Sequence, residues 1–150
     1  MFELRLQESG HAELQLAFQK LEAEFRDWHT AFEKLEPEST VVIQRRFDQE
    51  GPGWLALTRV YAAQKEKQYP GKTILRRTDA LYHSFEKGGA GNVTRIEALS
   101  AEFGSNVVYG FFHQDKRPII QISEQDELRF LSVATTEKTE RVRELGFQIQ

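Results

Sequence analysis

The sequence predicts an α+β fold in which a long N-terminal amphipathic helix and several shorter helices pack on a small, mainly antiparallel sheet. The helical apolar pattern is longest over residues 12–35. After a glycine-rich loop at 87–92 the pattern changes, and segments 93–97 and 99–104 are typical of short strands. A chain of 150 residues is long enough to bury about two-thirds of its unfolded surface. We therefore expect one domain, 1–150, with a single core.

Seven large apolar side chains repeat along residues 12–35 at alternating intervals of four and three. This spacing places them on one stripe of a helix of about six to seven turns. We expect the stripe to pack within its own domain, so that Leu21→Ala or Phe25→Ala would cost about 2–5 kcal/mol. The alternative is that part of this helix projects and pairs with a neighbouring subunit, because about 36 Å is long for a domain of this size. The stripe consists of Leu14, Phe18, Leu21, Phe25, Trp28, Phe32 and Leu35.

Proline and capping residues mark the boundaries of the neighbouring elements. Residues 2–6 alternate apolar and charged side chains, which predicts a short strand. Pro37 is expected to end the long helix. Ser39 or Thr40 is expected to cap a second helix that runs to about residue 49.

Two further helices are predicted over 54–68 and 74–85, between breaks rich in proline and glycine. Each has apolar side chains that can share one face. The expected inward residues are Trp54, Leu57, Val60 and Tyr61 in the first, and Ile74, Leu81 and Phe85 in the second.

The C-terminal third begins with a helical turn over 107–113, for which a strand is the alternative, followed by extended residues 118–122. Ser123 then caps a last helix, which is expected to break near 135–136 and to end at Gly146. The expected inward residues of that helix are Leu128, Leu131, Val142 and Leu145. Before it, Tyr109, Phe112 and Ile120 are expected to pack inside, with His113 and Arg117 near the surface.

The composition excludes several classes of protein. The chain has no cysteine and four histidines, so it offers neither a disulfide framework nor a thiolate zinc site. No apolar run approaches the roughly 20 residues of a membrane span, and the first residues lack the pattern of a signal peptide. We expect no metal, no cofactor and no membrane contact.

The catalytic motifs are incomplete. Gly71, Lys72 and Thr73 match the end of a phosphate-binding loop, but Glu66 stands where that motif needs its first glycine. His83 and Ser84 are neighbours that point about 100° apart on a helix, so the histidine is badly placed to activate the hydroxyl. We expect no enzymatic activity.

Basic side chains are concentrated between residues 59 and 77, where only Glu66 opposes them. This basic span could be an ordinary solvated face, a contact to an acidic protein surface, or a contact to DNA phosphates. No aromatic interleaving or recognised nucleic-acid module accompanies it. The span consists of Arg59, Lys65, Lys67, Lys72, Arg76 and Arg77.

The charge is also uneven along the chain. Residues 1–50 hold eleven acids and six bases, whereas residues 51–120 hold ten bases and six acids. Segments of opposite sign favour head-to-tail contacts between copies, although an ordinary mixed surface is the alternative. A heterologous contact of this kind closes into a ring when the rotation between subunits allows it. We expect a homo-oligomeric ring that is weak in isolation.

A spaced series of short motifs carries a family resemblance over roughly residues 40–135. The series runs from Trp54 through Lys65, Lys67 and the segment 74–81 to Tyr109-Gly110-Phe111-Phe112-His113-Gln114, Arg117-Pro118-Ile119-Ile120 and Ser123-Glu124-Gln125-Asp126. In these motifs the chain resembles the phage virion morphogenesis family, typified by the G protein of phage Mu and the tail-completion S proteins. It departs from the family pattern at Asp79-Ala80, Gly110 and Asp115.

The resemblance implies a non-enzymatic structural protein that acts in tail completion or head–tail joining. Its partners would be other virion proteins at the head–tail junction, in the virion or in the host cytoplasm during assembly. The alternative function is a DNA-contacting accessory protein that uses the basic span, and nothing recommends a small-ligand enzyme. The candidate interface residues are His113, Gln114, Arg117, Arg59, Lys65, Lys67, Lys72, Arg76 and Arg77.

Overall fold

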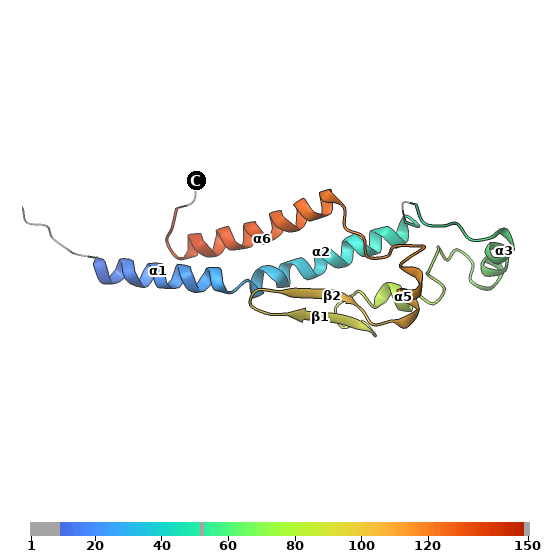
Figure 1. Ribbon diagram of the computed structural model, residues 1–150, viewed down its shortest axis with the longest axis horizontal. Coiled ribbons are helices and arrows are strands. Elements are labelled where there is room, and N and C mark those ends of the chain that lie inside the picture. Colours follow the sequence, from blue (N-terminus) through green and yellow to red (C-terminus); the bar gives the residue numbers. More distant parts are fainter. Residues whose placement is uncertain (1–9, 52, 149–150) are drawn as a thin grey trace, which may run out of the picture.

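A helix of 20 residues, α2 (His29–Asp48), runs along the middle of the molecule and carries other elements on its sides (Figure 1). This computed structural model describes residues 10–51 and 53–148. Helix α6 (Glu124–Glu144) packs along one side of α2, and the hairpin of β1 (Asn92–Ile96) and β2 (Ala101–Ser105) along another. The α+β class is confirmed.

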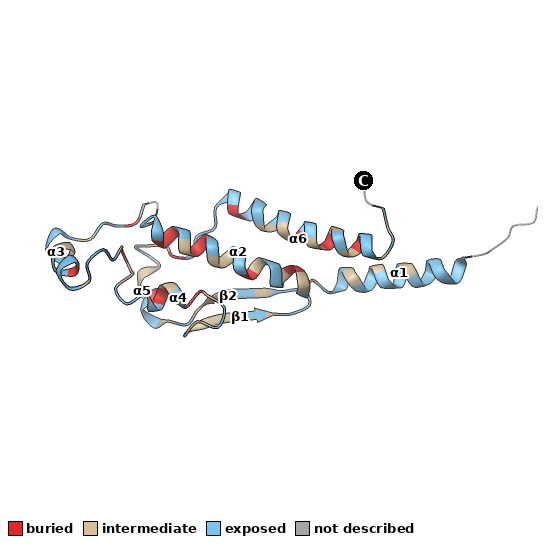
Figure 2. Cartoon of the chain, turned by 180° about the vertical axis from the view of Figure 1, so that it is seen from behind, coloured by how far each residue is buried: buried red, intermediate tan, exposed pale blue. Residues whose placement is uncertain are grey.

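The two ends of the elongated molecule carry different helices (Figure 1). Helix α1 (His11–Arg26) projects beyond one end of α2. Helix α3 (Arg59–Gln68) lies at the other end, and the short helices α4 (Ala80–His83) and α5 (Val108–His113) lie between α3 and the hairpin (Figure 2). The prediction of a helix rather than a strand at 107–113 is confirmed.

The sheet is small, as predicted, and its two described strands pair antiparallel. Asn92 lies opposite Ser105, and Ile96 lies opposite Ala101. The predicted strand at 2–6 lies outside the described residues.

The single helix predicted over 12–35 is wrong, because the chain breaks at Asp27 and Trp28. Asp27 is extended, and its carboxylate accepts a hydrogen bond from the His29 amide at 2.9 Å. The Trp28 amide donates to the carbonyl of Ala98 at 2.6 Å, which ties the break to the turn of the hairpin. The apolar spacing continues across the break, so periodicity alone gives no sign of it.

The predicted helix end at Pro37 is also wrong, since α2 continues through it. Ser39 and Thr40 are therefore interior residues rather than caps, and their hydroxyls donate to the Glu36 carbonyl at 2.7 and 3.2 Å. An interior proline costs about 3 kcal/mol because it removes a backbone hydrogen bond. Burial of Ala31 before the proline and of Phe47 after it offsets that cost.

Two of the predicted middle helices are shorter than expected. Helix α3 begins at Arg59 because the Thr58 hydroxyl caps it, and residues 54–58 are not helical. Trp54 is buried as predicted, but Val60 and Tyr61 are exposed. Of the helix predicted over 74–85 only α4 forms. Its expected inward residues, Ile74, Leu81 and Phe85, are nevertheless buried.

Helix α6 begins where its capping signal predicts. The Ser123 side chain accepts from the Asp126 amide, and the Asp126 carboxylate accepts in return from the Ser123 amide. The predicted break at 135–136 is absent from this fully described helix, and Gly146 follows its end with φ 90°. Val142 is buried as expected, whereas Leu128 and Leu131 are exposed.

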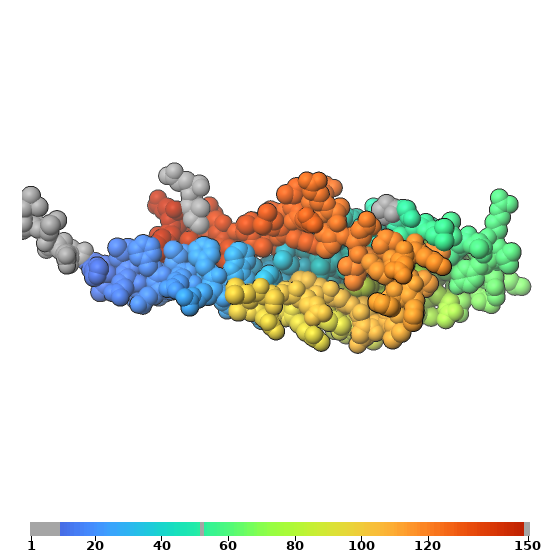
Figure 3. Space-filling view, in the orientation of Figure 1, coloured from blue at the N-terminus to red at the C-terminus, as the bar shows by residue number. Residues whose placement is uncertain are grey.

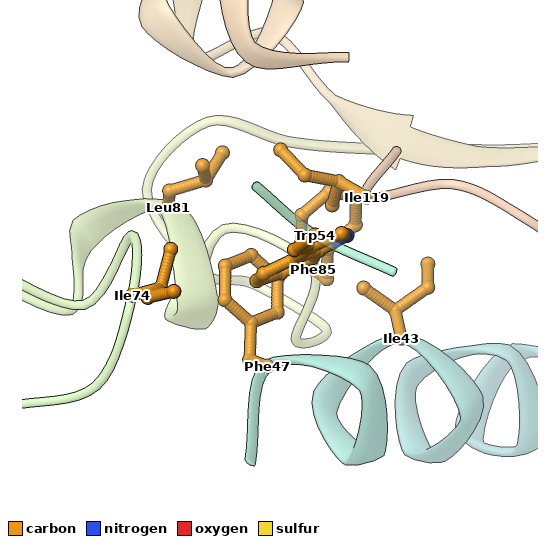
Figure 4. Packing of buried hydrophobic residues seen from close by; sticks show 7 residues of the cluster. All are labelled: Ile43, Phe47, Trp54, Ile74, Leu81, Phe85 and Ile119. Atoms are coloured by element: carbon orange, nitrogen blue, oxygen red, sulfur yellow. The ribbon is translucent and has the colours of Figure 1, made fainter. Parts of the chain in front are cut away.

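The core lies near the C-terminal end of α2, where distant segments meet (Figure 4). Phe47 is completely buried, and its ring meets those of Trp54 and Tyr82 edge-on at 5.7 Å. The Trp54 indole nitrogen donates to the Pro118 carbonyl at 2.9 Å. The buried members are Ile43, Phe47, Trp54, Ile74, Leu81, Phe85 and Ile119.

The N-terminal part of the apolar stripe lies outside this core (Figure 2). None of the residues 11–26 of α1, all of which the structure describes, is buried. Leu14, Phe18 and Phe25 are 53%, 54% and 52% exposed. The prediction that the whole stripe holds the fold together is therefore wrong for α1, which projects beyond the end of α2. Pairing of this helix with a neighbouring subunit stays a prediction.

We predict that Phe47→Ala lowers the free energy of unfolding by about 3–5 kcal/mol, because it empties a fully buried site. Urea denaturation at neutral pH measures the loss. Phe25→Ala is the matched control and should cost less than about 1 kcal/mol in the isolated monomer. Equal losses in the two variants would contradict this placement of the core.

Candidate partner-binding groove

An open groove with a volume of about 670 Å³ lies between segment 55–58, α3 and α5. Apolar and aromatic side chains, such as Leu55, Tyr61 and Tyr109, line part of it. No carboxylate lines it among the residues that the structure describes. Its basic lining side chains are Lys65, Arg77, His113, Lys116 and Arg117. We call this the α3–α5 groove.

Hydrogen bonds from two of these basic residues hold the walls of the groove in place. Arg117, after α5, donates through Nε to the Leu55 carbonyl at 2.8 Å. Lys65, on α3, is buried and donates through Nζ to the Thr73 carbonyl. These two side chains are thus partly structural. Arg77 and Lys116 are exposed, so their charges face solvent at the groove.

Burial and neighbouring charge change the titration of the groove residues. Burial lowers the pKa of Lys65, an effect that Glu50 partly opposes. Burial, assisted by the Arg117 guanidinium, lowers the pKa of His113 below its ordinary value. His113 is therefore neutral at neutral pH, and the exposed positive charge at the groove comes from Arg77 and Lys116.

The structure brings together four of the predicted interface residues, Lys65, Arg77, His113 and Arg117, at this groove. His113 and Arg117 are half-buried rather than fully at the surface. Gln114 has an internal role, because its side-chain Oε1 accepts from the backbone amides of Ile119 and Ile120 at 2.9 and 3.2 Å. Arg59 and Lys67 are exposed on α3 but do not line the groove.

The other two predicted residues, Lys72 and Arg76, belong to an internal ion-pair cluster around Asp79. Arg76 donates to Asp79 at 2.8 Å and to Asp48 at 2.7 Å, and Lys72 also contacts Asp79. The Arg76 guanidinium lies 3.8 Å from the centre of the Tyr82 ring. Burial alone would raise the pKa of Asp79, but the hydrogen bonds from Lys72 and Arg76 outweigh it and lower that pKa.

The incomplete catalytic motifs serve local structure. Glu66, which replaces a glycine of the phosphate loop, accepts a hydrogen bond from the Gly71 amide at 3.2 Å. The Ser84 hydroxyl is buried and donates to the Leu81 carbonyl at 2.6 Å, while His83 lies 3.0 Å from Glu86. His83 and Ser84 thus engage different partners.

The prediction that Tyr109, Phe112 and Ile120 pack inside is wrong, since all three are exposed. The reason lies at Gly110, the buried residue of α5. A side chain there would place its Cβ 2.8 Å from the Leu81 side chain, so α5 packs through its glycine. The aromatic residues consequently point outward, with Phe111 81% and Phe112 71% exposed.

Sequence reasoning missed Lys116, which lines the groove beside Arg117. It lies in the charged turn after α5, outside the basic span. The one available signal was its position between His113 and Arg117, two residues already singled out.

Comparisons with known proteins add no relative. The chain matches no family model, and searches of curated proteins and of solved structures also return no match. Among the described residues, no helix is long and apolar enough to cross a membrane. The same residues contain no group of three or more His, Cys, Asp or Glu side chains that could hold a metal ion.

We predict that Asp79→Asn lowers the free energy of unfolding at pH 7 by about 1.5–3 kcal/mol, because charged hydrogen bonds to Lys72 and Arg76 are lost. Asparagine tolerates the positive φ of this position, so the backbone is retained. The native pKa of Asp79 is lowered, so its contribution is present above the unfolded pKa of about 4. It is lost as the pH falls through the native pKa.

Urea unfolding of the wild type and of Asp79→Asn at pH 7 and at pH 3 tests this prediction. The difference in free energy of unfolding between the two proteins should be smaller at pH 3 than at pH 7. Asp48→Asn is the control, since Asp48 is exposed and contacts only one member of the cluster. A constant difference at both pH values would show that the Asp79 charge is not involved.

Proposed function

We propose that the chain is a non-enzymatic structural protein of phage assembly, acting in tail completion or head–tail joining. The observation that carries the proposal is the exposed aromatic surface of α5, formed by Tyr109, Phe111 and Phe112 beside the α3–α5 groove. These residues belong to the motif in which the chain resembles the phage virion morphogenesis family. The same segment thus supports both a binding surface and the family resemblance.

The chemistry of this surface suits a protein partner. Exposed aromatic side chains are enriched at the energetic centres of protein interfaces, and large exposed apolar patches are uncommon on soluble monomers. Phe111 and Phe112 contact one another edge-on, with ring centroids 6.0 Å apart. We infer that partners at the head–tail junction contact this surface, in the virion or in the host cytoplasm during assembly.

One observation favours the alternative function of contacting DNA. Residues 53–79 and 106–118, which form the α3 end, contain eight bases and three acids. However, Lys65 donates to a backbone carbonyl, and Lys72 and Arg76 pair with Asp79. The basic span therefore offers fewer free cations than its composition implies. With few phosphate contacts, the DNA-binding constant depends only weakly on salt. Its logarithm falls with the logarithm of the salt concentration with a slope of about 0.9 per phosphate contact.

We predict that Phe111→Ser combined with Phe112→Ser lowers the yield of complete tailed particles by about tenfold or more, in phage whose genome encodes this chain. Truncating one aromatic centre of an interface costs about 2 kcal/mol, and tenfold corresponds to 1.4 kcal/mol. Electron microscopy of particles and plaque counts measure the effect. The melting temperature of the purified variant should stay close to that of wild type.

Val60→Ser is the control, because Val60 is an equally exposed apolar residue on α3. The proposal fails if both variants give normal particles and purified virions and assembly intermediates lack the chain. Loss of duplex DNA binding in the basic-span variant Arg59→Glu with Lys67→Glu, together with normal particles, would favour the accessory function instead.

A further inference from the structure

We propose that the α3–α5 groove binds an acidic segment of a partner protein, which lies in it as an extended peptide. The inference rests on the proposed assembly function for its biological setting and adds the chemistry of the partner. Its physical basis is the combination of basic side chains, apolar walls and unpaired backbone groups in one groove. The space-filling view shows the green residues around α3 and the orange residues around α5 as neighbours at one end of the molecule (Figure 3).

The basic side chains of the groove lack carboxylate partners. Within the part of the chain that the structure describes, none of the five forms an ion pair with an acidic side chain. Elsewhere such pairs are common, and Arg45 Nη2 lies 2.6 Å from a carboxylate oxygen of Asp126. Lys65 and Arg117 donate to uncharged backbone carbonyls instead. The groove therefore keeps an excess of positive charge that suits a carboxylate.

The exposed cations of this set are Arg77 and Lys116, which come from different segments of the groove. Arg77 lies in the loop between α3 and α4, and Lys116 lies in the turn after α5. The Arg77 guanidinium is 5.7 Å from the centre of the Tyr69 ring. Because this contact involves no acceptor oxygen, the N–H groups of the guanidinium remain available to a carboxylate.

The apolar walls of the groove favour a protein over a nucleic acid. Leu55, Tyr61 and Tyr109 line it and are 61%, 47% and 42% exposed. Apolar side chains of a peptide would cover these surfaces. Tyrosine rings can also stack on single-stranded bases, but an aliphatic side chain such as Leu55 offers no stacking platform, and phosphates gain nothing from covering it.

The open stretch of chain between α2 and α3 supplies backbone groups for an extended peptide (Figure 1). Residues 54–58 form neither helix nor strand, and Thr58 is extended with ψ 148°. Among the described residues, the amides and carbonyls of Ala56 and Leu57 have no hydrogen-bond partner, and both residues line the groove. An extended peptide supplies N–H donors and carbonyl acceptors to such groups. A phosphate accepts from amides but offers no donor to the carbonyls.

Helix α1 of a second copy is a poorer occupant of the groove. Its glutamates are already paired within the chain, Glu22 with Arg26 and Glu24 with Lys138. The interior of a helix also has no spare backbone groups to bond to Ala56. The groove features thus favour an extended acidic segment over this helix.

Binding of synthetic peptides to the whole chain tests the inference. The probe is a fluorescein-labelled pool of short peptides that contain glutamate, phenylalanine and leucine in random order. Fluorescence anisotropy measures the dissociation constant. Wild type should bind this pool about tenfold or more tightly than pools in which lysine replaces glutamate, or serine replaces phenylalanine and leucine. Methylation of the peptide nitrogens should also weaken binding, because it removes the backbone donors.

A charge-reversed variant locates the binding site. The groove variant carries Arg77→Glu and Lys116→Glu, at exposed positions. It should lose about tenfold or more in affinity for the glutamate pool and should prefer the lysine pool, a reversal that misfolding would not produce. The control carries Lys20→Glu and Arg143→Glu, which make the same change in net charge at exposed positions outside the groove. It should keep the wild-type preference.

Four results would overturn the inference. Equal binding of the three pools to wild type would show that the groove recognises neither acidic nor apolar side chains. Unchanged preference in the groove variant would place the peptide elsewhere. Tighter binding of oligothymidine or duplex DNA than of the glutamate pool, lost in the groove variant, would make the groove a nucleic-acid surface. Self-association of wild type in sedimentation velocity that the groove variant abolishes would assign the groove to a second copy.

The virion role fails independently of this site. Peptide binding that the groove variant reverses, together with absence of the chain from virions and assembly intermediates, rejects only the phage function. Presence of the chain in virions together with equal binding of the three pools rejects only the acidic peptide.

Discussion

The burial of Phe47 is the constraint on which the rest of the structure depends. Its ring is fully enclosed where α2 meets Trp54, Tyr82 and Phe85, so one side chain holds together segments from the middle of the chain. The core is confined to this end of α2. The opposite end has α6 as its main support, and α1 extends beyond it without a buried residue among 11–26. The unequal placement of the core thus produces an anchored end, which carries the groove, and a projecting end, which carries the apolar stripe.

Local signals predicted local structure well. The Ser123–Asp126 capping box gave the start of α6, because both of its hydrogen bonds form within one turn. The strands of the hairpin were predicted within two residues, since their pattern and the loops beside them are also local. The helix end predicted at Pro37 was wrong because the energetic cost of an interior proline is visible in the local sequence. The burial that offsets this cost depends on segments far away in the sequence.

Periodicity establishes which side chains share a face, but it does not establish what covers that face. The stripe from Leu14 to Leu35 is regular, yet its first part is exposed and its last part is half-buried. The candidate site shows the same limit. Lys72 and Arg77 are both basic residues of the same span, but Asp79 pairs with Lys72, whereas Arg77 lies at the groove with its guanidinium 5.7 Å from the centre of the Tyr69 ring. Only the fold decides which charges of the basic span remain available to a partner.

Neighbouring charge and burial together set the protonation of His113 in the groove, and this protonation would respond to an acidic partner. Arg117 and burial together lower the pKa of His113, so the histidine stays neutral beside the cations of the empty groove. A carboxylate that docks there would favour the protonated histidine and raise its pKa. Binding would then take up a proton and be stronger below neutral pH, with the sign set by the rise of the pKa on binding.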